Sequence, residues 1–113
     1  MLIALVRTDP RAVSRKQEAF LSLELANSIA RALSCAEAKI ESHEVEVLHR
    51  HFDKGEIDVG GVSIVIIVND HPSLRANLEE RRDRIVADLY NIIHSSIHGL
   101  VWILPVSGVF AKF

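Results

Sequence analysis

Residues 60–72 read GGVSIVIIVNDHP, and this stretch decides the predicted fold. Its segment Val62–Val68 has six β-branched aliphatic residues among seven, a composition typical of strands. We expect this strand to be central in a sheet, because an apolar run of this kind suits burial on both faces. Asn69–Ser73 then breaks the strand, and Pro72 suits the first turn of a following helix.

The same order of elements is found in the first half of the chain. Leu2–Val6 is a short apolar run that predicts a strand, and Asp9-Pro10 ends it. Ser14 is a good N-cap, and Gln17 completes the spacing of a capping box. The apolar periodicity then predicts a helix as far as about Ser34.

Each predicted helix leads to a second strand. In the second half the helix of some twenty residues is expected to run to Ile93, with Gly99 ending the helical region. The expected second strands are Val45–Leu48 and Leu100–Leu104, and a short terminal strand is expected at Val109–Phe113. The arginines Arg81 and Arg82 flank the apolar stripe of the second helix and are expected to cover its edge with their stems.

Two consecutive β-α-β units predict an α/β (α+β) fold. Right-handed crossovers would place both helices on one face of a mixed four-stranded core sheet, with a short extra hairpin or terminal strand. The length of 113 residues suits one domain, 1–113, made of the halves 1–60 and 61–113. No third layer is available to cover the other face of the sheet, so we expect a homotrimer that packs these faces together.

The composition narrows the function classes and the compartment. A net charge of −2 and a pI of about 6.3 leave no basic footprint for a nucleic-acid partner. No apolar run reaches the roughly 18 residues that a membrane span needs, and the first residues lack the layout of a signal peptide. The single cysteine, Cys35, suits a reducing compartment, so we expect a cytoplasmic protein without an internal disulfide.

The chain resembles the tautomerase superfamily over nearly its whole length. After the first helix come His49-Arg50-His51-Phe52 and a glycine-rich turn at Gly55 and Gly60-Gly61, as in the strand and hairpin of that family. The family includes 4-oxalocrotonate tautomerase, 5-carboxymethyl-2-hydroxymuconate isomerase, malonate semialdehyde decarboxylase and macrophage migration inhibitory factor. The resemblance implies fused β-α-β units that form trimers and an isomerase-like chemistry on small keto or unsaturated acids.

One position departs from the family pattern. Family enzymes use an N-terminal proline, exposed after methionine removal, as a general acid or base. Residue 2 here is Leu2, and so large a residue is expected to leave Met1 in place. The α-amine of Met1 has a reference pKa of about 7.7–8.0 and is the remaining weak candidate for catalysis. We therefore expect no proline-dependent tautomerase activity.

The resemblance also implies that arginines near the helix starts bind a substrate carboxylate. Arg11 stands near the first helix start, and His71 and Arg75 stand near the second. A guanidinium forms paired hydrogen bonds with a carboxylate, and a helix N-terminus attracts anions. These three residues are therefore the candidates for binding a small carboxylate ligand.

The histidines give a weaker pattern. His49 and His51 share one face of a strand, and His94 and His98 are spaced as neighbours on a helix. Zinc needs three or four ligands that converge on one point, and the spacing of the sequence supplies no further ligand to either pair. We therefore expect no metal site and no cofactor.

Two other function classes remain open. A ferredoxin-like regulatory or binding module has the same β-α-β-β-α-β order, but its strands interleave in the order 4-1-3-2. In the tautomerase arrangement the two strands of each half are parallel neighbours. The third possibility is a structural subunit of a hetero-oligomer whose partner provides the proline. Strand order separates the first two classes.

Overall fold

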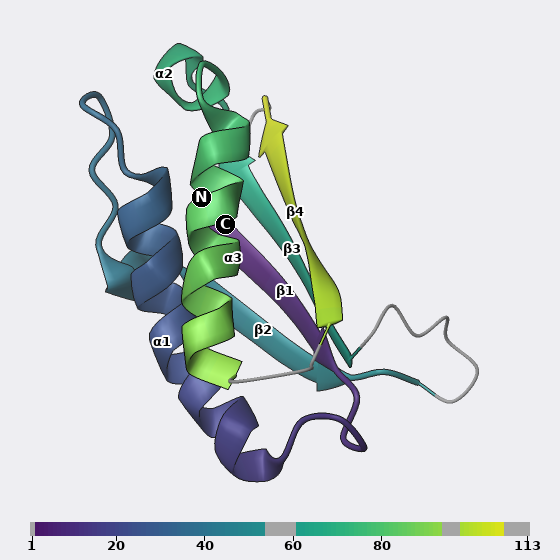
Figure 1. Ribbon diagram of the computed structural model, residues 1–113. Coiled ribbons are helices and arrows are strands. Elements are labelled where there is room, and N and C mark those ends of the chain that lie inside the picture. Colours follow the sequence, from purple (N-terminus) through teal and green to yellow (C-terminus); the bar gives the residue numbers. More distant parts are fainter. Residues whose placement is uncertain (1, 54–60, 94–97, 108–113) are drawn as a thin grey trace, which may run out of the picture.

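A computed structural model describes residues 2–53, 61–93 and 98–107 (Figure 1). Its elements run in the order β1, α1, a 3₁₀ helix η1, β2, β3, α2, α3 and β4. Their bounds are β1 Leu2–Thr8, α1 Arg15–Leu33, η1 Ser42–Glu44, β2 Glu46–His51, β3 Gly61–Asn69, α2 Pro72–Arg75, α3 Leu78–Ile93 and β4 His98–Val106. None of the described helices is long and apolar enough to cross a membrane.

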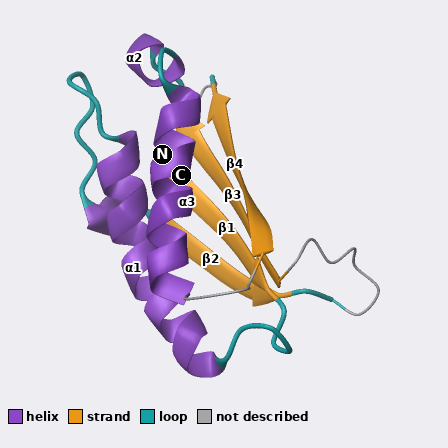
Figure 2. Ribbon diagram, in the orientation of Figure 1, coloured by secondary structure: helices purple, strands orange, loops and turns teal. Residues whose placement is uncertain are grey.

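The four strands form one mixed sheet in the order β2-β1-β3-β4. Parallel pairs join β1 to β2 and β3 to β4, and the central pair, β1 and β3, is antiparallel. Helices α1 and α3 lie side by side on one face of this sheet (Figure 2). The predicted fold class is confirmed. The strand order is the one expected for the tautomerase arrangement and differs from the interleaved ferredoxin-like order.

Alternate residues of the strands build the core beneath the two helices. Ala4, Ile64 and Ile66 have no exposed surface and lie in the two central strands, in register with one another. They pack with apolar residues of the helices, chiefly Leu21, Leu25, Ile29 and Ile85. The predicted central position of Val62–Val68 is confirmed, since β3 has neighbours on both sides.

At the end of each long helix, carbonyl groups accept hydrogen bonds from a side chain in the other half of the chain. The predicted capping box is present, because Ser14 accepts from the Gln17 amide and Gln17 accepts from the Ser14 amide. The same Gln17 side chain donates to the Ile93 carbonyl at the end of α3 (3.1 Å). In return, the Arg81 guanidinium donates to the carbonyls of Ala32 (2.9 Å) and Ser34 (2.8 Å), around the end of α1. Arg81 is therefore a buried helix cap rather than the edge cover that the sequence suggested.

The second helical region differs from the single long helix that was predicted. It is divided into α2 and α3 by a turn at Ala76 and Asn77. The Asn77 side chain accepts from Nε of Arg81 (2.6 Å), and the Asn77 carbonyl accepts from the Arg81 amide (3.1 Å). The turn thus coincides with the residue that holds the buried guanidinium in position.

Two strand boundaries also correct the prediction. The expected strand Val45–Leu48 is displaced, because a turn of 3₁₀ helix occupies Ser42–Glu44 and β2 continues through His51. Gly99 does not end a helix but lies inside β4, where an added Cβ would come within 2.1 Å of the Val62 carbonyl oxygen. Gly61 has φ of 123°, which favours glycine where β3 begins. The predicted strand Val109–Phe113 lies outside the described residues.

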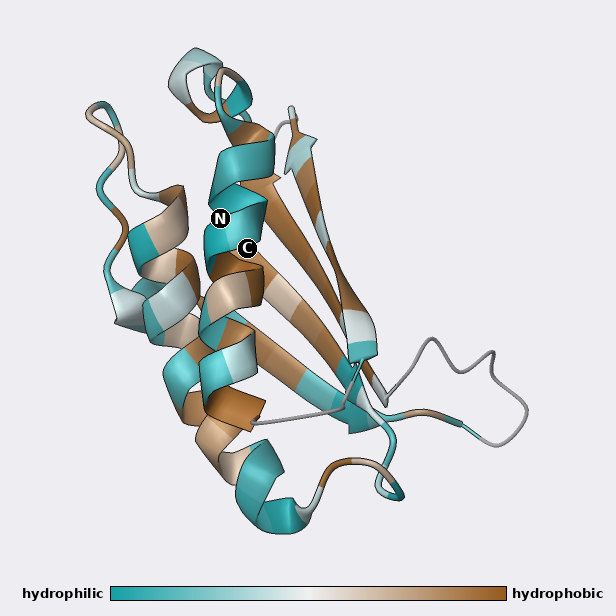
Figure 3. Cartoon of the chain, viewed as in Figure 1, coloured by the Kyte–Doolittle hydropathy of each residue, from teal (hydrophilic) through white to brown (hydrophobic). Residues whose placement is uncertain are grey.

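The helix-free face of the sheet carries apolar residues on all four strands, with polar residues such as Arg7, Glu46, Arg50 and Ser63 among them. Figure 3 shows strongly hydrophobic residues running along the sheet. The strand register places the opposite set of alternate residues on this face, and Leu5, Leu48, Leu100 and Trp102 among them are more than a third exposed. The apolar members of this sheet face are Ile3, Leu5, Leu48, Val65, Ile67, Leu100, Trp102, Leu104 and Val106.

Candidate functional site

A hollow of about 340 Å³ lies where β1 begins and β3 ends. We call it the N-terminal hollow. Antiparallel pairing of Leu2 with Val68 brings the start of the first strand beside the helix start of the second half. The connector after α1 forms its other wall. The lining residues are Leu2, Leu33, Ala38, Lys39, Ile40, Glu44, Val68, Asn69, His71 and Leu74.

Three ionisable side chains line this largely apolar hollow. Lys39 and His71 can offer positive charge, and Glu44 brings a carboxylate. The Lys39 ammonium lies 3.7 Å from the Glu41 carboxylate, and its side chain is 82% exposed. A flexible exposed lysine of this kind can turn toward a bound anion with little loss of stability, because exposed ion pairs are weak.

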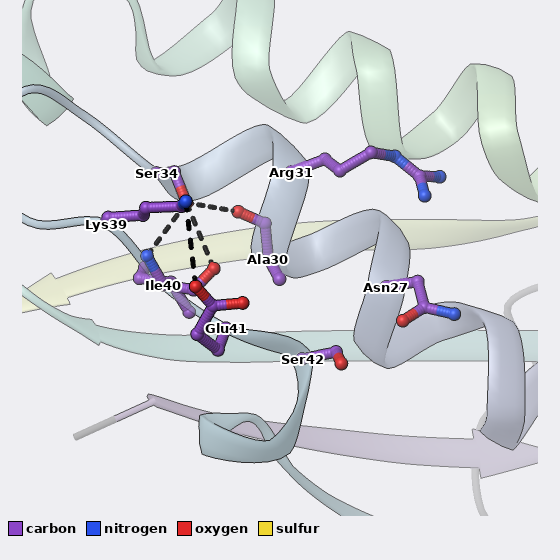
Figure 4. A pocket seen from close by; sticks show the side chains of 8 residues that line it. All are labelled: Asn27, Ala30, Arg31, Ser34, Lys39, Ile40, Glu41 and Ser42. Carbon is purple, nitrogen blue, oxygen red and sulfur yellow. Dashed lines mark hydrogen bonds and ion pairs between the residues drawn. The ribbon is translucent and has the colours of Figure 1, made fainter.

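The connector that carries Lys39 is fixed by Ser34. The Ser34 hydroxyl donates to the Ala30 carbonyl (2.7 Å) and accepts from the Ile40 amide (2.9 Å). Figure 4 shows these contacts in an adjoining hollow of about 390 Å³, which shares Lys39 and Ile40 with the N-terminal hollow. Lys39 therefore lines both hollows and belongs to a connector that is fixed by hydrogen bonds.

The predicted ligand residues do not meet at one place in a single chain. His71 lines the N-terminal hollow, whereas Arg75 does not. The Arg75 guanidinium instead pairs with Asp70, which raises the arginine pKa through the hydrogen bond and the charge of the carboxylate. Arg11 lies beyond the opposite end of β1 and pairs with Asp9 at 3.1 Å. Met1 lies outside the described residues.

A second polar cluster lies at the far end of β1, on the helix-covered side of the sheet. We call it the Thr8 cluster; it contains Thr8, Glu18, His49 and His51. The Thr8 hydroxyl donates to Oε1 of Glu18 (3.0 Å) and lies 2.8 Å from Nε2 of His49. Nε2 of His51 lies 2.8 Å from the same Glu18 oxygen. Sequence analysis found the shared face of the two histidines but missed Glu18, because α1 carries it to the sheet from 31 residues away.

Known structures share this architecture. Native fused 4-OT superposes with a TM-score of 0.69 at 12% identity, covering 97% of this chain and 94% of that chain. The chain has the tautomerase fold. R7 fused 4-OT, described as a wild-type asymmetric trimer, superposes with a TM-score of 0.66 at 17% identity, covering 97% of this chain and 94% of that chain. A macrophage migration inhibitory factor-like protein from Entamoeba histolytica gives a TM-score of 0.59 at 13% identity, covering 92% and 89%.

The predicted tautomerase-like fold is thus confirmed by structural comparison, without a match in sequence. No protein-family model matches this chain, and no curated protein matches it. Identities below a fifth leave room for a different set of functional residues on the same backbone. In this chain the second residue is Leu2, which is buried beside the hollow.

Another contact joins the two halves beside the N-terminal hollow. The Ser73 hydroxyl donates to the Glu37 carboxylate at 2.7 Å, linking α2 to the connector after α1. This hydrogen bond is the main cause that lowers the pKa of Glu37 below its ordinary value. The helix start of the second half is therefore tied to the turn that carries Lys39.

Proposed function

We propose that this protein binds a small carboxylate in the N-terminal hollow and does not use proline-based tautomerase chemistry. The observation that carries the proposal is an apolar hollow at the start of β1 with Lys39 and His71 on its wall. Apolar walls with a few charged groups are typical of small-molecule sites. The tautomerase fold supports a ligand of this class, since a fused 4-OT shares it.

The two basic residues suit different parts of a keto acid. Lys39 would hold the carboxylate as a mobile positive charge. His71 would lie near the carbon skeleton, where an imidazole can give or take a proton. Arg75 would add a second charge only after leaving Asp70, and Arg11 would have to come from another subunit. With Leu2 at the second position, the α-amine of Met1 is the remaining amine base in this proposal.

We further propose that the chain works as a homotrimer. The nine apolar residues of the helix-free sheet face support this, because nothing in the described part of the chain covers them. One structure of the same fold, R7 fused 4-OT, is described as a trimer. Packing three such faces together would bury these residues. We also propose a cytoplasmic location, because the single cysteine suits a reducing compartment.

A purely structural subunit is the second candidate. The Arg75–Asp70 pair favours it, because a guanidinium already matched by a carboxylate is less available to a ligand. In this alternative the sheet face joins a different chain that provides the catalytic proline. Mass measurement of the purified chain separates the two, since a stable trimer of one chain leaves no sheet face for a partner.

Calorimetric titration with pyruvate, phenylpyruvate and small dicarboxylates tests the ligand proposal. We expect binding by the wild type and a loss of roughly ten- to a hundredfold in affinity for Lys39→Ala and for His71→Ala, since a hydrogen bond to a charged group contributes about 1.5–3 kcal/mol. Lys16→Ala, an exposed lysine on α1, is the matched control and should bind normally. Absence of binding by the wild type would refute the carboxylate site.

Light scattering tests the assembly. Trp102→Glu should convert the trimer into smaller species, because it places a charge on the sheet face. Tyr90→Glu changes an aromatic residue that is equally exposed, at 60%, on α3, and should leave the trimer intact. A wild-type monomer at micromolar concentration would end the trimer proposal.

A further inference from the structure

We propose that Glu18, His49 and His51 bind one divalent transition-metal ion. One ligand atom from each residue lies within 4.8 Å of the others. Two imidazoles and one carboxylate form a donor set that zinc uses in sites with an open fourth position. The proposal concerns a different site from the N-terminal hollow, because six steps along β1 at about 3.3 Å each separate the two by roughly 20 Å.

The backbone fixes the three ligands from two directions. His49 and His51 lie in β2 in register with Val6 and Thr8, so both side chains project from the helix-covered face. Glu18 belongs to the first turn of α1, which passes over that end of the sheet. A ligand set that joins strand β2 to helix α1 is held by regular secondary structure rather than by a loop.

The present contacts are close to those that a metal requires. Zinc–nitrogen bonds of about 2.0–2.1 Å in a tetrahedral site place neighbouring ligand atoms roughly 3.3 Å apart. Nε2 of His51 and Oε1 of Glu18 are 2.8 Å apart and would separate slightly. The remaining ligand separations are at most 4.8 Å, and in the proposed site side-chain rotation would bring these atoms closer together.

Thr8 is the positioning residue of the proposed site. It is fully buried, and its hydroxyl lies within hydrogen-bonding distance of both Glu18 and His49. A hydroxyl in that place limits the directions in which the Glu18 carboxylate can point, whereas its contact with Nε2 of His49 would be given up if that nitrogen bound the ion. Groups that orient metal ligands in this way contribute about tenfold to a hundredfold in metal affinity.

The cluster is open to an ion from one side. The Glu18 side chain is only 12% exposed, whereas that of His51 is 50% exposed. An ion would therefore enter past the exposed His51 imidazole and reach the nearly buried Glu18 carboxylate. The buried carboxylate favours a cation, and the open side leaves a coordination position for water.

Zinc titration of the untagged full-length protein, stripped with a chelator, tests the site. We expect one zinc ion per chain in the micromolar range or tighter, with a rise in melting temperature because the ion binds the folded state. Cobalt(II) should give the intense visible absorption of a tetrahedral site. A wild type that binds neither ion in this range overturns the proposal.

Variants locate the ion. Glu18→Gln keeps the shape and one hydrogen-bond acceptor, and it should weaken zinc binding at least tenfold and abolish the thermal shift. His49→Ala and His51→Ala should do the same, and Thr8→Val should weaken binding by about tenfold. His43→Ala and His98→Ala change exposed histidines elsewhere and are the controls.

The outcomes distinguish zinc binding by Glu18, His49 and His51 from incidental zinc binding elsewhere on the protein. If zinc affinity is unchanged in Glu18→Gln, the ion is held elsewhere and the assignment is wrong. If a histidine variant fails to fold, Glu18→Gln decides the question, because it preserves the local contacts. Carboxylate binding in the N-terminal hollow should be the same with and without chelator, so failure of either proposal leaves the other standing.

Discussion

The two halves of the molecule place different residues at equivalent points of the same sheet. When the centres of β1 and β3 are matched, His49 and His51 correspond to Ile103 and Pro105, and Thr8 corresponds to Val68. Thr8 and Val68 are both buried. One end of the sheet therefore carries a hydrogen-bonded polar cluster, whereas the equivalent strand positions at the other end, beside the N-terminal hollow, are apolar.

The segments at the two helix starts share an Asp–Arg pair, although only α1 has a side-chain N-cap. Asp9 accepts two side-chain hydrogen bonds from Arg11, and Asp70 accepts two from Arg75. Both carboxylates are largely buried, at 10% and 14% exposed, while the arginines reach into solvent. The comparison shows that both halves keep an Asp–Arg pair at the helix start, whereas the sheet ends differ in chemistry.

Exchanging residues between the sheet ends should have the largest effect. Ile103→His places an imidazole among apolar neighbours, and we expect a loss of about 2–4 kcal/mol in the free energy of unfolding. The reverse exchange, His49→Ile, should cost less, because Thr8 keeps its bond to Glu18. Urea unfolding measures both. Equal losses would mean that the two ends are interchangeable.

The Arg81 cap should come next in size. Arg81→Met leaves the carbonyls of Ala32 and Ser34 without their charged donor, and we expect a loss of about 1.5–3 kcal/mol. Arg84→Met changes an exposed arginine one turn away and is the control. Urea unfolding gives the two values. A result for Arg81→Met no larger than for Arg84→Met would contradict the capping role.

The Gln17 side chain, which caps the end of α3, is uncharged, so its removal should lower the free energy of unfolding by a smaller amount. Gln17→Ala removes its bond to Ile93 and its part of the capping box, with an expected loss of about 1 kcal/mol. Lys16→Ala changes a residue in the same first turn of α1 but removes neither of these contacts, so it is the control. Thermal unfolding followed by circular dichroism resolves a difference of this size. A loss larger than that of Arg81→Met would reverse the proposed ranking of the two caps.

The smallest expected effect concerns Glu37. Its lowered pKa means that the folded state holds the carboxylate better than the unfolded chain does, so this contribution is present above the ordinary pKa and disappears as the pH falls through the lowered one. Ser73→Ala should raise the Glu37 pKa toward its ordinary value, as measured by NMR titration of the carboxyl carbon. Ser42→Ala, an exposed serine nearby, should leave it unchanged.

Local sequence patterns predicted the parts of the fold that depend on neighbouring residues. The run Val62–Val68 identified a central strand, and Ser14 with Gln17 identified the start of α1. Both are short-range effects of side-chain branching and hydrogen bonding. The order of the strands stayed open at the level of sequence, because two β-α-β units fit both the tautomerase arrangement and the interleaved ferredoxin-like order, and the structure shows the former.

The missed features all depend on partners far away in the sequence. The break at Asn77 accompanies the burial of Arg81 against the end of α1, which no local pattern reveals. Glu18 joins His49 and His51 only through the packing of α1 on the sheet. Arg75 looked like a ligand residue because its distance from Asp70, five positions earlier, gave no sign of the pair.

The crossed caps between α1 and α3 have a consequence for how the chain becomes stable. Each half finishes a helix with carbonyl groups whose donor belongs to the other half. Residues 1–60 and 61–113, produced as separate fragments, would each expose an uncapped helix end and half of a split core. We expect each fragment alone to lack fixed structure and the two to fold on mixing, so the duplicated architecture behaves as one cooperative unit.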